Sequence, residues 1–273
     1  MLPLNFSPLT ISTVRSTRHP LFRAAYDRLW EEFGAANEME SEEVLNRRFE
    51  WYPCTRVGGA ALRYEMAVVT RGRELIAVRD HVAIVRPLSQ GGGHAATVHM
   101  SHVVVEPEWR RTGVSAWLRA VPLQTGRAAL KAAGVSPDSP ITLVAEMEHP
   151  TSVEDMRTIR LLAYEKAGFL KVDPNRLDYH QPDFRPPALI DATGGPRPVP
   201  FTLIVRRVGR EAQGSLSPEE CRGLIASLYE MYQTGCRPQD MSTLWSALER
   251  WPTGTDPVRL IPPSSPATLG VEI

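Results

Sequence analysis

The sequence predicts an α/β fold, and three observations lead to it. Apolar residues first recur at helical spacing, between residues 21 and 33 and again after Ser41. The period then changes to that of strands in two β-branched runs, 61–72 and 74–87, which meet at a Gly-Arg turn typical of a hairpin. Further along the chain, strand and helix patterns alternate, as they do when helices cover a sheet. One α/β body is therefore expected to fill most of the chain.

The elements of the first half are assigned from their periods and caps. Residues 9–14 alternate between apolar and polar side chains, which predicts a strand. Ser41 can cap the second helix, whose first turn is acidic. After the hairpin come a strand at 97–107 and a helix at 114–121, which Pro122 is expected to end or kink. The apolar face of that helix is expected to comprise Val114, Trp117, Leu118 and Val121.

The second half adds a strand at 141–150, a helix at 155–169 and two last strands, 169–173 and 201–209. Between these last strands lies a proline-rich connection, 174–200, which is far longer than the usual connection of about 4–6 residues. A connection of this length is typical of a segment with a function of its own.

Beyond Gly209 the composition changes, which divides the chain into a body, 1–210, and a C-terminal helical extension with an irregular tail, 211–273. Two amphipathic helices are expected here, with apolar faces that bury each other: Leu224, Ile225 and Leu228 on the first, Leu244, Leu248 and Trp251 on the second. Further aromatic surface comes from Tyr229, Tyr232 and Trp245. We therefore expect this helical hairpin to pack on the body or on a second subunit, the latter in a homodimer.

The composition is that of an ordinary globular protein, with 42% hydrophobic and 23% charged residues. Basic and acidic residues both number 31, so the net charge favours neither nucleic acid nor an anionic membrane as a partner. No apolar run approaches the roughly 20 residues of a membrane helix. Cys54, Cys221 and Cys236 are too few and too widely spaced for a disulfide framework or a tetrahedral metal site. We expect a cytoplasmic protein without a metal.

A strand that runs directly into a helix marks a candidate anion site. Residues 103–115 read VVVEPEWRRTGVS, so three valines lead through two arginines and a glycine to a helix start. The first N–H groups of a helix lack partners and lie at the positive end of its dipole, so they attract phosphate. Gly113 allows close approach, Arg110 and Arg111 add positive charge, and Ser115 offers a hydroxyl. The alternative is a plain surface turn.

The order of the elements and two motifs resemble the GCN5-related N-acetyltransferase superfamily. In that family the acyl-coenzyme A pyrophosphate lies on a loop of pattern Q/R-x-x-G-x-G/A, matched here by Arg110-Arg111-Thr112-Gly113-Val114-Ser115. The Y-E-K-x-G-F signature is matched by Tyr164-Glu165-Lys166-Ala167-Gly168-Phe169. The resemblance covers roughly residues 10–209. This chain departs from the pattern at Ser115, at Arg157 where many relatives have asparagine, at Pro122 and in its long connection.

The resemblance implies a fold and a reaction. The fold is a mixed, mostly antiparallel sheet of about seven strands, splayed between strands 4 and 5 and flanked by helices. The reaction is transfer of an acetyl group from acetyl-CoA to an amine acceptor, expected to be a small molecule, in a ternary complex without a metal. The coenzyme is expected to contact Val103, Val104 and Val105, whose strand supplies an N–H for the oxyanion, and the turn of Arg110, Arg111, Thr112, Gly113, Val114 and Ser115.

Proton transfer is assigned to three side chains. Tyr164 matches the tyrosine that protonates the departing thiolate in many relatives. His99 stands where histone-acetylating relatives have a strand glutamate, and an imidazole can act as a base at neutral pH. Glu146, a charge within an apolar strand, is the second candidate base. Each side chain also has a structural alternative: a buried helix aromatic, a hydrogen-bonded strand histidine and a solvated strand end, respectively.

The acceptor side is expected to involve the connection 174–200, which borders the cleft in this family. Its apolar residues and prolines favour an ordered segment that folds over the cleft, with Tyr179, His180 and Gln181 as acceptor contacts. A connection that only packs on the body is the alternative. Two other functions stay open: a longer-chain or O-acyltransferase of the same fold, and a non-catalytic acyl-CoA-binding or interaction protein that uses its C-terminal helices.

Overall fold

The computed structural model describes residues 8–88, 93–148, 156–251 and 256–265. Its elements are, in chain order, β1 (Leu9–Val14), α1 (Phe22–Phe33), α2 (Glu42–Phe49), β2 (Thr55–Val57), β3 (Ala60–Arg71), β4 (Glu74–Pro87), β5 (His94–His99), β6 (Val103–Val105), the 3-10 turn η1 (Pro107–Trp109), α3 (Val114–Ala132), β7 (Ile141–Met147), α4 (Met156–Glu165), β8 (Leu170–Val172), β9 (His180–Gln181), α5 (Pro187–Ala192), β10 (Val199–Pro200), β11 (Thr202–Arg207), β12 (Ser215–Leu216), α6 (Pro218–Tyr232), α7 (Pro238–Arg250) and β13 (Val258–Ile261). Parts of three predicted segments lie outside the described residues: 149–150 of the strand, 155 of the helix and 266–273 of the tail.

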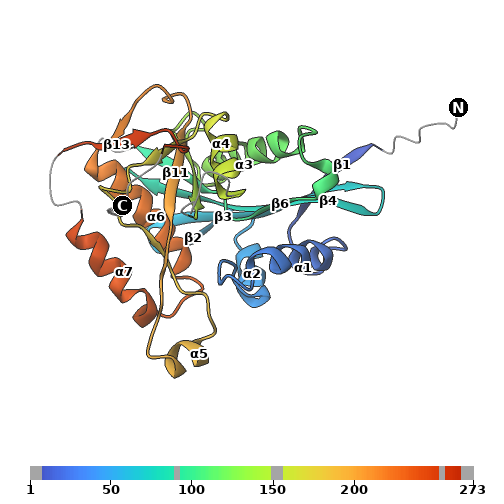
Figure 1. Cartoon of the computed structure of the whole chain (residues 1–273), viewed down its shortest axis with the longest axis horizontal. Coiled ribbons are helices and arrows are strands. Elements are labelled where there is room, and N and C mark those ends of the chain that lie inside the picture. Colours follow the sequence, from blue (N-terminus) through green and yellow to red (C-terminus); the bar gives the residue numbers. More distant parts are fainter. Residues whose placement is uncertain (1–7, 89–92, 149–155, 252–255, 266–273) are drawn as a thin grey trace, which may run out of the picture.

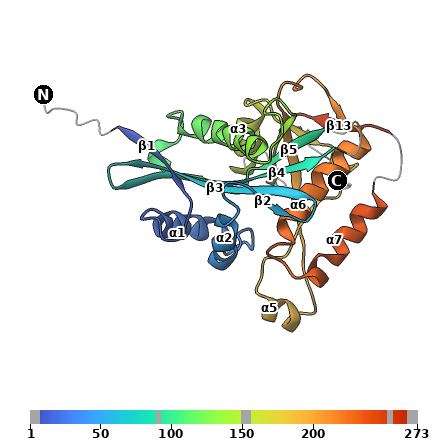
Figure 2. The ribbon, with the colours of Figure 1, turned by 180° about the vertical axis from the view of Figure 1, so that it is seen from behind.

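A large sheet forms the centre of the molecule, with α1 and α2 on one side and α3 on the other (Figures 1 and 2). The strands are ordered β1-β3-β4-β5-β7-β11-β8-β13-β12, with β2 attached to β3 and β6 attached to β4. Among the described strands the pairing of β5 with β7 is parallel and the other pairings are antiparallel. The predicted mixed, mostly antiparallel sheet flanked by helices is therefore confirmed.

Strand alternation distributes the core over the two faces of the sheet. On β3, Leu62, Tyr64 and Met66 point to the face that carries α1, α2 and α6. Their neighbours Ala67 and Val69 point to the opposite face, where they meet the start of α3. Apolar side chains occupy both faces of this strand, and that is why its β-branched run was a strong signal in the sequence.

The predicted strand 97–107 is interrupted by a bulge, and this bulge opens the sheet. His99 pairs with Val82 of β4, whereas Val103 pairs with Arg79. Three residues, 100–102, therefore stand opposite two residues of β4, which is the geometry of a β-bulge. On the other side, β7 pairs with β5 only as far as Val144 and then continues to Met147. The sheet thus separates between β6 and β7, which confirms the splay expected between strands 4 and 5.

Helix α3 continues through Pro122 to Ala132, so the helix does not end at the proline. A proline inside a helix costs about 3 kcal/mol, and packing must offset that cost. The helix packs very close to the sheet at Gly126, where an added Cβ would stand only 2.9 Å from a Val98 methyl carbon. The assignment of Trp117 to the inner face was also wrong, since this side chain is 53% exposed.

The C-terminal helices pack on the body, which was one of the two expected arrangements, the other being a contact with a second subunit. Helix α6 contacts α7 and also β3, β4 and β5. The rings of Tyr229 and Tyr232, expected to leave aromatic surface, are buried in the core that α6 shares with the sheet. Just before the tail that was expected to be irregular, β13 (Val258–Ile261) adds a strand that pairs with β8 and with β12. Residues on both sides of the predicted boundary at 210 therefore share one hydrophobic core.

Candidate active site

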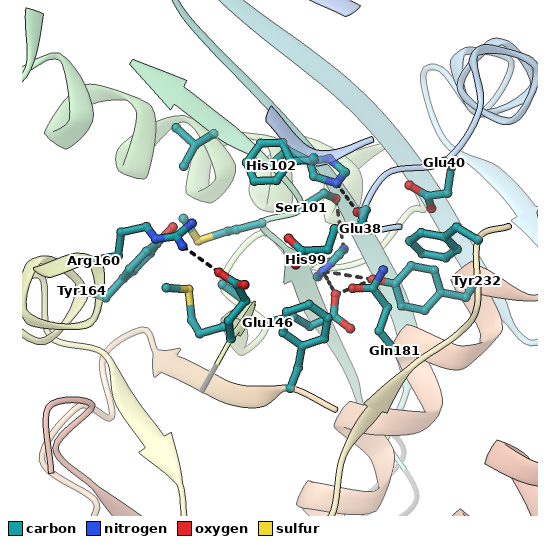
Figure 3. Close-up of a pocket in the computed structure, with 18 residues that line it drawn as sticks. Glu38, Glu40, His99, Ser101, His102, Glu146, Arg160, Tyr164, Gln181 and Tyr232 are labelled. Carbon is teal, nitrogen blue, oxygen red and sulfur yellow. Dashed lines mark hydrogen bonds and ion pairs between the residues drawn. The ribbon is translucent and has the colours of Figure 1, made fainter. Parts of the chain in front are cut away.

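A cavity lies where the sheet separates between β6 and β7 (Figure 3). It encloses about 680 Å³ of empty space, including its opening to solvent. The walls come from the β5–β6 bulge, β7, α4, the connection between α1 and α2, the long connection 174–200, and α6. The lining residues include five that the sequence predicted: His99, Val103, Glu146, Tyr164 and Gln181.

His99 and Glu146, predicted as alternative bases, form a single buried cluster. His99 Nε2 lies 2.8 Å from Glu146 Oε2, and Ser101 Oγ lies 3.1 Å from His99 Nδ1. The hydroxyl of Tyr179 donates to Glu146 Oε1 over 2.5 Å, and that of Tyr232 donates to Glu146 Oε2. Burial alone would raise the pKa of the Glu146 carboxyl, but His99 and the two phenols outweigh it, so the net shift of this pKa is downward. Glu146 is thus held as a carboxylate.

Tyr164 lies on α4 and lines the cavity, and its hydroxyl oxygen accepts a hydrogen bond. Arg79 Nη2 donates to the phenol oxygen over 3.1 Å. A guanidinium has only donors, so the phenol oxygen must accept and its own proton is directed elsewhere. The ring is 7% exposed and packs edge-on against Phe169, with centroids 5.0 Å apart. Tyr164 is therefore fixed in position with its proton available.

Arg79 is a buried cation whose donors are only partly used. It is 1% exposed, and its Nε and Nη1 atoms have no hydrogen-bond partner among the described residues. Arg79 lies opposite Val103 in the pairing of β4 with β6, at the place where the sheet separates. A buried donor without a partner costs free energy, so this position fits a ligand that supplies oxygen acceptors.

The predicted anion site is an exposed turn that leads into α3. Gly113 has φ of +96° and is the N-cap residue before Val114, so no side chain at this position accepts from the first N–H groups of the helix. Arg111 also has a positive φ, of +67°, which is costly for a residue other than glycine. A Cβ added to Gly113 would meet nothing within 4 Å, so the space in front of the helix start is open. The geometry therefore allows an anion to approach the free N–H groups.

A buried ion pair between His102 and Asp80 holds the bulge. Asp80 Oδ1 accepts from the His102 backbone N–H and from its Nδ1, both over 2.9 Å, and His102 Nε2 donates to the Glu38 carbonyl over 2.8 Å. Burial would lower the pKa of His102, but Asp80 raises it to about 9. Burial would raise the pKa of Asp80, but His102 lowers it to about 2. The charged pair therefore ties β4 and the bulge to the connection between α1 and α2.

Replacing Asp80 by asparagine is expected to lower the free energy of unfolding by about 3 kcal/mol near pH 6, because it leaves a buried imidazole without its counter-charge. The pKa of His102 is raised, so its contribution is complete below about pH 6.5 and disappears as the pH rises through about 9. The pKa of Asp80 is lowered, so its contribution is present above about pH 4 and lost towards pH 2.

Urea unfolding of the wild type and of D80N across this pH range checks the expectation, with the exposed Asp27→Asn on α1 as the control. The wild type should lose stability between about pH 6.5 and 9, and D80N should lack this loss. Parallel pH profiles of the two proteins would contradict it.

The three predicted acceptor contacts differ in their positions. Gln181 lines the cavity, is 3% exposed, and its Nε2 has no partner among the described residues. Tyr179 contacts the cavity cluster through Glu146. His180 is not among the lining residues, and its Nδ1 lies 3.6 Å from Asp178 Oδ1. Part of the connection 174–200 therefore does border the cavity.

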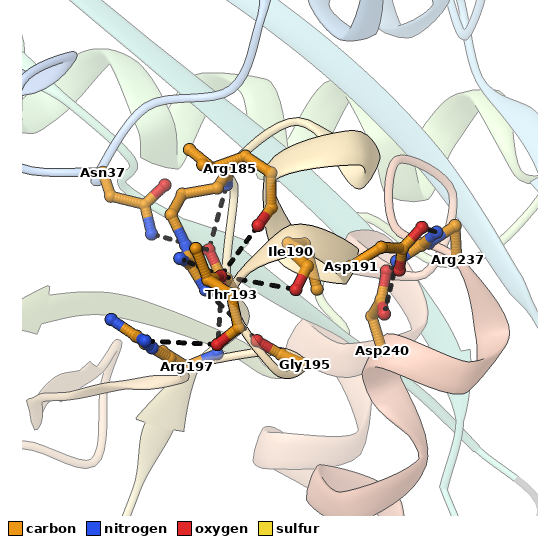
Figure 4. A network of polar contacts seen from close by, with 11 residues as sticks. Asn37, Arg185, Ile190, Asp191, Thr193, Gly195, Arg197, Arg237 and Asp240 are labelled. Atoms are coloured by element: carbon orange, nitrogen blue, oxygen red, sulfur yellow. Dashed lines mark hydrogen bonds and ion pairs between the residues drawn. The ribbon is translucent and has the colours of Figure 1, made fainter.

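A polar network fastens this connection to its neighbours (Figure 4). Asp183 accepts from the side chains of Asn37 and Arg185 and from the backbone N–H of Arg197. Arg237, the N-cap residue of α7, forms an ion pair with Asp191 of α5, with an N–O distance of 2.7 Å. The segment that bears Gln181 is thus anchored to the connection between α1 and α2 and to α7.

Several functional candidates could not be found from the sequence. Tyr232 lies on α6, in the extension that the family resemblance does not cover. The sequence indicated only that it adds aromatic surface, whereas its hydroxyl donates to Glu146. Arg79 and Glu38 lie in segments without a motif. Within the described residues no group of three or more His, Cys, Asp or Glu side chains could hold a metal ion. No helix of the described part combines the length and apolarity needed to span a bilayer.

No protein-family model matches the chain, and no curated protein matches it. Solved structures with a similar chain trace include the ribosomal-protein-S18-alanine N-acetyltransferase from Escherichia coli, with 16% identity over 74% of this chain and 94% of that chain and a TM-score of 0.34. An acyl-CoA N-acyltransferase from Pseudomonas aeruginosa has 18% identity over 73% and 99%, with a TM-score of 0.36. An aminoglycoside acetyltransferase from an uncultured soil metagenomic sample has 14% identity over 60% and 87%, with a TM-score of 0.36.

Proposed function

We propose that this protein transfers an acetyl group from acetyl-CoA to a small amine acceptor by direct attack in a ternary complex. The observation that supports the proposal most is the separation of β6 from β7. With this separation, the cavity lies at one end of β6 and the proposed pyrophosphate turn follows the other end. Val103 at the start of β6 lines the cavity, and the turn 110–115 follows the other end of β6 after η1. The proposed anion site and the proposed acid–base residues of the cavity would thereby lie next to each other along one strand.

The coenzyme side of the proposal uses groups that have unused donors. The turn from Arg110 to Ser115 would hold the pyrophosphate through free helix N–H groups and two guanidinium charges. The amide-containing pantetheine arm would lie along β6, where Arg79 offers buried donors without partners. On its far side from β4, β6 carries no strand in the described part of the sheet, so a backbone N–H from residues 103–105 is the proposed oxyanion donor.

Tyr164 is proposed to be the general acid of the reaction. Its oxygen accepts from Arg79, so its proton can go to the thiolate as the carbon–sulfur bond breaks. His99 and Glu146 are proposed to shape the floor of the cavity. Both ring nitrogens of His99 already face partners, Ser101 and Glu146, so a proton from the acceptor reaches this pair only through the Ser101 hydroxyl.

Two measurements test the proposed function. Calorimetry should show binding of acetyl-CoA to the full chain. Release of free CoA should then accelerate when benzylamine, a diamine, a dipeptide or an aminoglycoside is added, and mass spectrometry should identify the acetylated amine. An alcohol and a longer acyl-CoA serve as comparison substrates for the related chemistries. Absence of acetyl-CoA binding, or thioester hydrolysis that no amine accelerates, would contradict the proposal.

Gln181→Leu is expected to raise the KM for the acceptor about tenfold, without changing the acetyl-CoA dissociation constant. Gln181 Nε2 is buried and has no partner in the described residues, and a hydrogen bond to an acceptor oxygen is worth roughly 0.5–1.5 kcal/mol. Steady-state kinetics with the best amine of the series measures the change. Gln239→Leu, on the exposed side of α7, is the control. An unchanged acceptor KM in Gln181→Leu would show that this residue does not contact the acceptor.

A further inference from the structure

Glu38 differs from the other carboxylates of the cavity, because its carboxylate has no partner among the residues that the structure describes. Four glutamates line the cavity, and three of them form ion pairs: Glu40 with Arg48, Glu146 with His99, and Glu148 with both Arg157 and Arg160. Within the described part of the chain, the Glu38 carboxylate forms neither a hydrogen bond nor an ion pair, although the residue is half-buried. A half-buried carboxylate that faces a cavity and forms no ion pair within the described residues fits a cationic ligand.

The backbone of Glu38 is held firmly in the connection between α1 and α2. Its carbonyl accepts from His102 Nε2 over 2.8 Å, and its N–H donates to the Phe33 carbonyl over 3.2 Å. The preceding residue, Asn37, bonds to Asp183 of the connection 174–200. Figure 3 shows the Glu38 side chain at the cavity together with those of Ser101 and His99. The backbone that carries this carboxylate is therefore held by the β5–β6 bulge and by the connection 174–200, which both border the cavity.

The charges around Glu38 make it a match for an amine. Burial and the neighbouring Glu148 carboxylate raise its pKa, while Arg160, His102 and Arg157 lower it, and the result is a pKa of about 7. A carboxyl group of this kind is partly ionised at neutral pH, which is the condition for an effective general base. A cation bound between Glu38 and Glu148 would also remove their mutual repulsion.

We propose that Glu38 binds the ammonium group of the acceptor and takes its proton before the amine attacks. This inference rests on the proposed acetyl transfer. One N–H bond breaks and its proton goes to a Glu38 oxygen, after which the nitrogen lone pair attacks the thioester carbon. The carbon–sulfur bond then breaks and the thiolate receives the proton of Tyr164. A second N–H proton returns through solvent to the Tyr164 oxygen, and Glu38 releases its proton to water.

The other candidate bases are less accessible to an acceptor. Glu146 accepts hydrogen bonds from Tyr179 and Tyr232 and contacts His99, and its side chain is only 7% exposed. Both nitrogens of His99 are engaged, and this residue is 2% exposed. Glu38 has a carboxylate that an ammonium can reach without breaking an existing bond. The structure therefore favours Glu38 over the two bases that the sequence predicted.

The kinetic test compares Glu38→Gln with Glu43→Gln, which removes an exposed carboxylate of α2 and changes the net charge equally. With acetyl-CoA and the best amine of the series, kcat/KM of the wild type should fall below about pH 7. Glu38→Gln should lower kcat/KM roughly 100-fold and remove this acidic limb, and Glu38→Asp should restore part of both. Glu43→Gln and His99→Gln should keep the limb. A limb that persists in Glu38→Gln, or that disappears only in His99→Gln, would overturn the inference.

A binding test decides the ammonium contact without turnover. Benzylammonium is titrated into the complex of the protein with free CoA at pH 7, in buffers of different ionisation enthalpy. Because a bound cation lowers the pKa of Glu38, the wild type should release up to about half a proton and Glu38→Gln none. Equal proton release in both proteins, or none in the wild type, would overturn the contact. Failure of the wild type to bind CoA at all would instead contradict the proposed function.

Discussion

Replacing Tyr164 by phenylalanine is expected to lower kcat for acetyl transfer by about 10²–10³-fold, with the acetyl-CoA dissociation constant nearly unchanged. The phenol oxygen accepts from Arg79, so its proton is free for the departing thiolate, and phenylalanine removes that donor. An acetyl thioester of an acidic aryl thiol needs less protonation as it departs. The ratio of wild-type to variant rates should therefore be smaller for this substrate than for acetyl-CoA.

The substitution also leaves Arg79 with one partner fewer, so its effect on stability must be measured separately. Removal of a buried hydrogen bond costs roughly 1–3 kcal/mol, and thermal unfolding will show whether Tyr164→Phe stays folded at the assay temperature. Tyr26→Phe, a buried phenol of α1 outside the cavity, is the control. If Tyr164→Phe turns over at the rate of this control, Tyr164 is a packing residue and the acid must be sought elsewhere.

Replacing Gly113 by valine is expected to weaken acetyl-CoA binding more than 100-fold, on the order of 3 kcal/mol. A Cβ at Gly113 meets nothing in the protein itself, so the added side chain would project into the open space in front of α3. That space is where the pyrophosphate is proposed to lie on the free N–H groups. Titration calorimetry with acetyl-CoA measures the loss.

Gly134→Val is a matched control for backbone strain at the other end of the same helix. Gly134 has φ of +74° and also has open space around its Cβ position, so valine is strained there as it is at Gly113. Both variants should lose similar stability, but only Gly113→Val should lose coenzyme affinity. Equal acetyl-CoA affinity in the two variants would remove the turn 110–115 from the coenzyme site.

The sequence by itself determined the features that depend on neighbouring residues. The β-branched runs 61–72 and 74–87, which meet at a Gly-Arg turn, predicted a hairpin, and β3 and β4 do pair as antiparallel neighbours. Ser41 occupies the predicted N-cap of α2, although its side chain accepts no capping hydrogen bond there. At the N-cap of α6, the Ser217 hydroxyl accepts from the Glu220 N–H over 3.0 Å. The splay of the sheet, the turn 110–115 before a helix and the position of His99, Glu146 and Tyr164 at one cavity followed from motifs and the family resemblance.

Other features depended on contacts between distant segments, and only the tertiary structure decided them. Pro122 stays inside α3 because the helix packs closely on the sheet, and this outweighs a local rule. β13 is a strand because β8 and β12 supply its hydrogen bonds. Glu38 became a candidate base because the other cavity glutamates form ion pairs, whereas its carboxylate forms none with the residues that the structure describes. The packing of segments that are far apart in the chain determines which charged side chains form ion pairs. No local period or motif in the sequence predicts that packing.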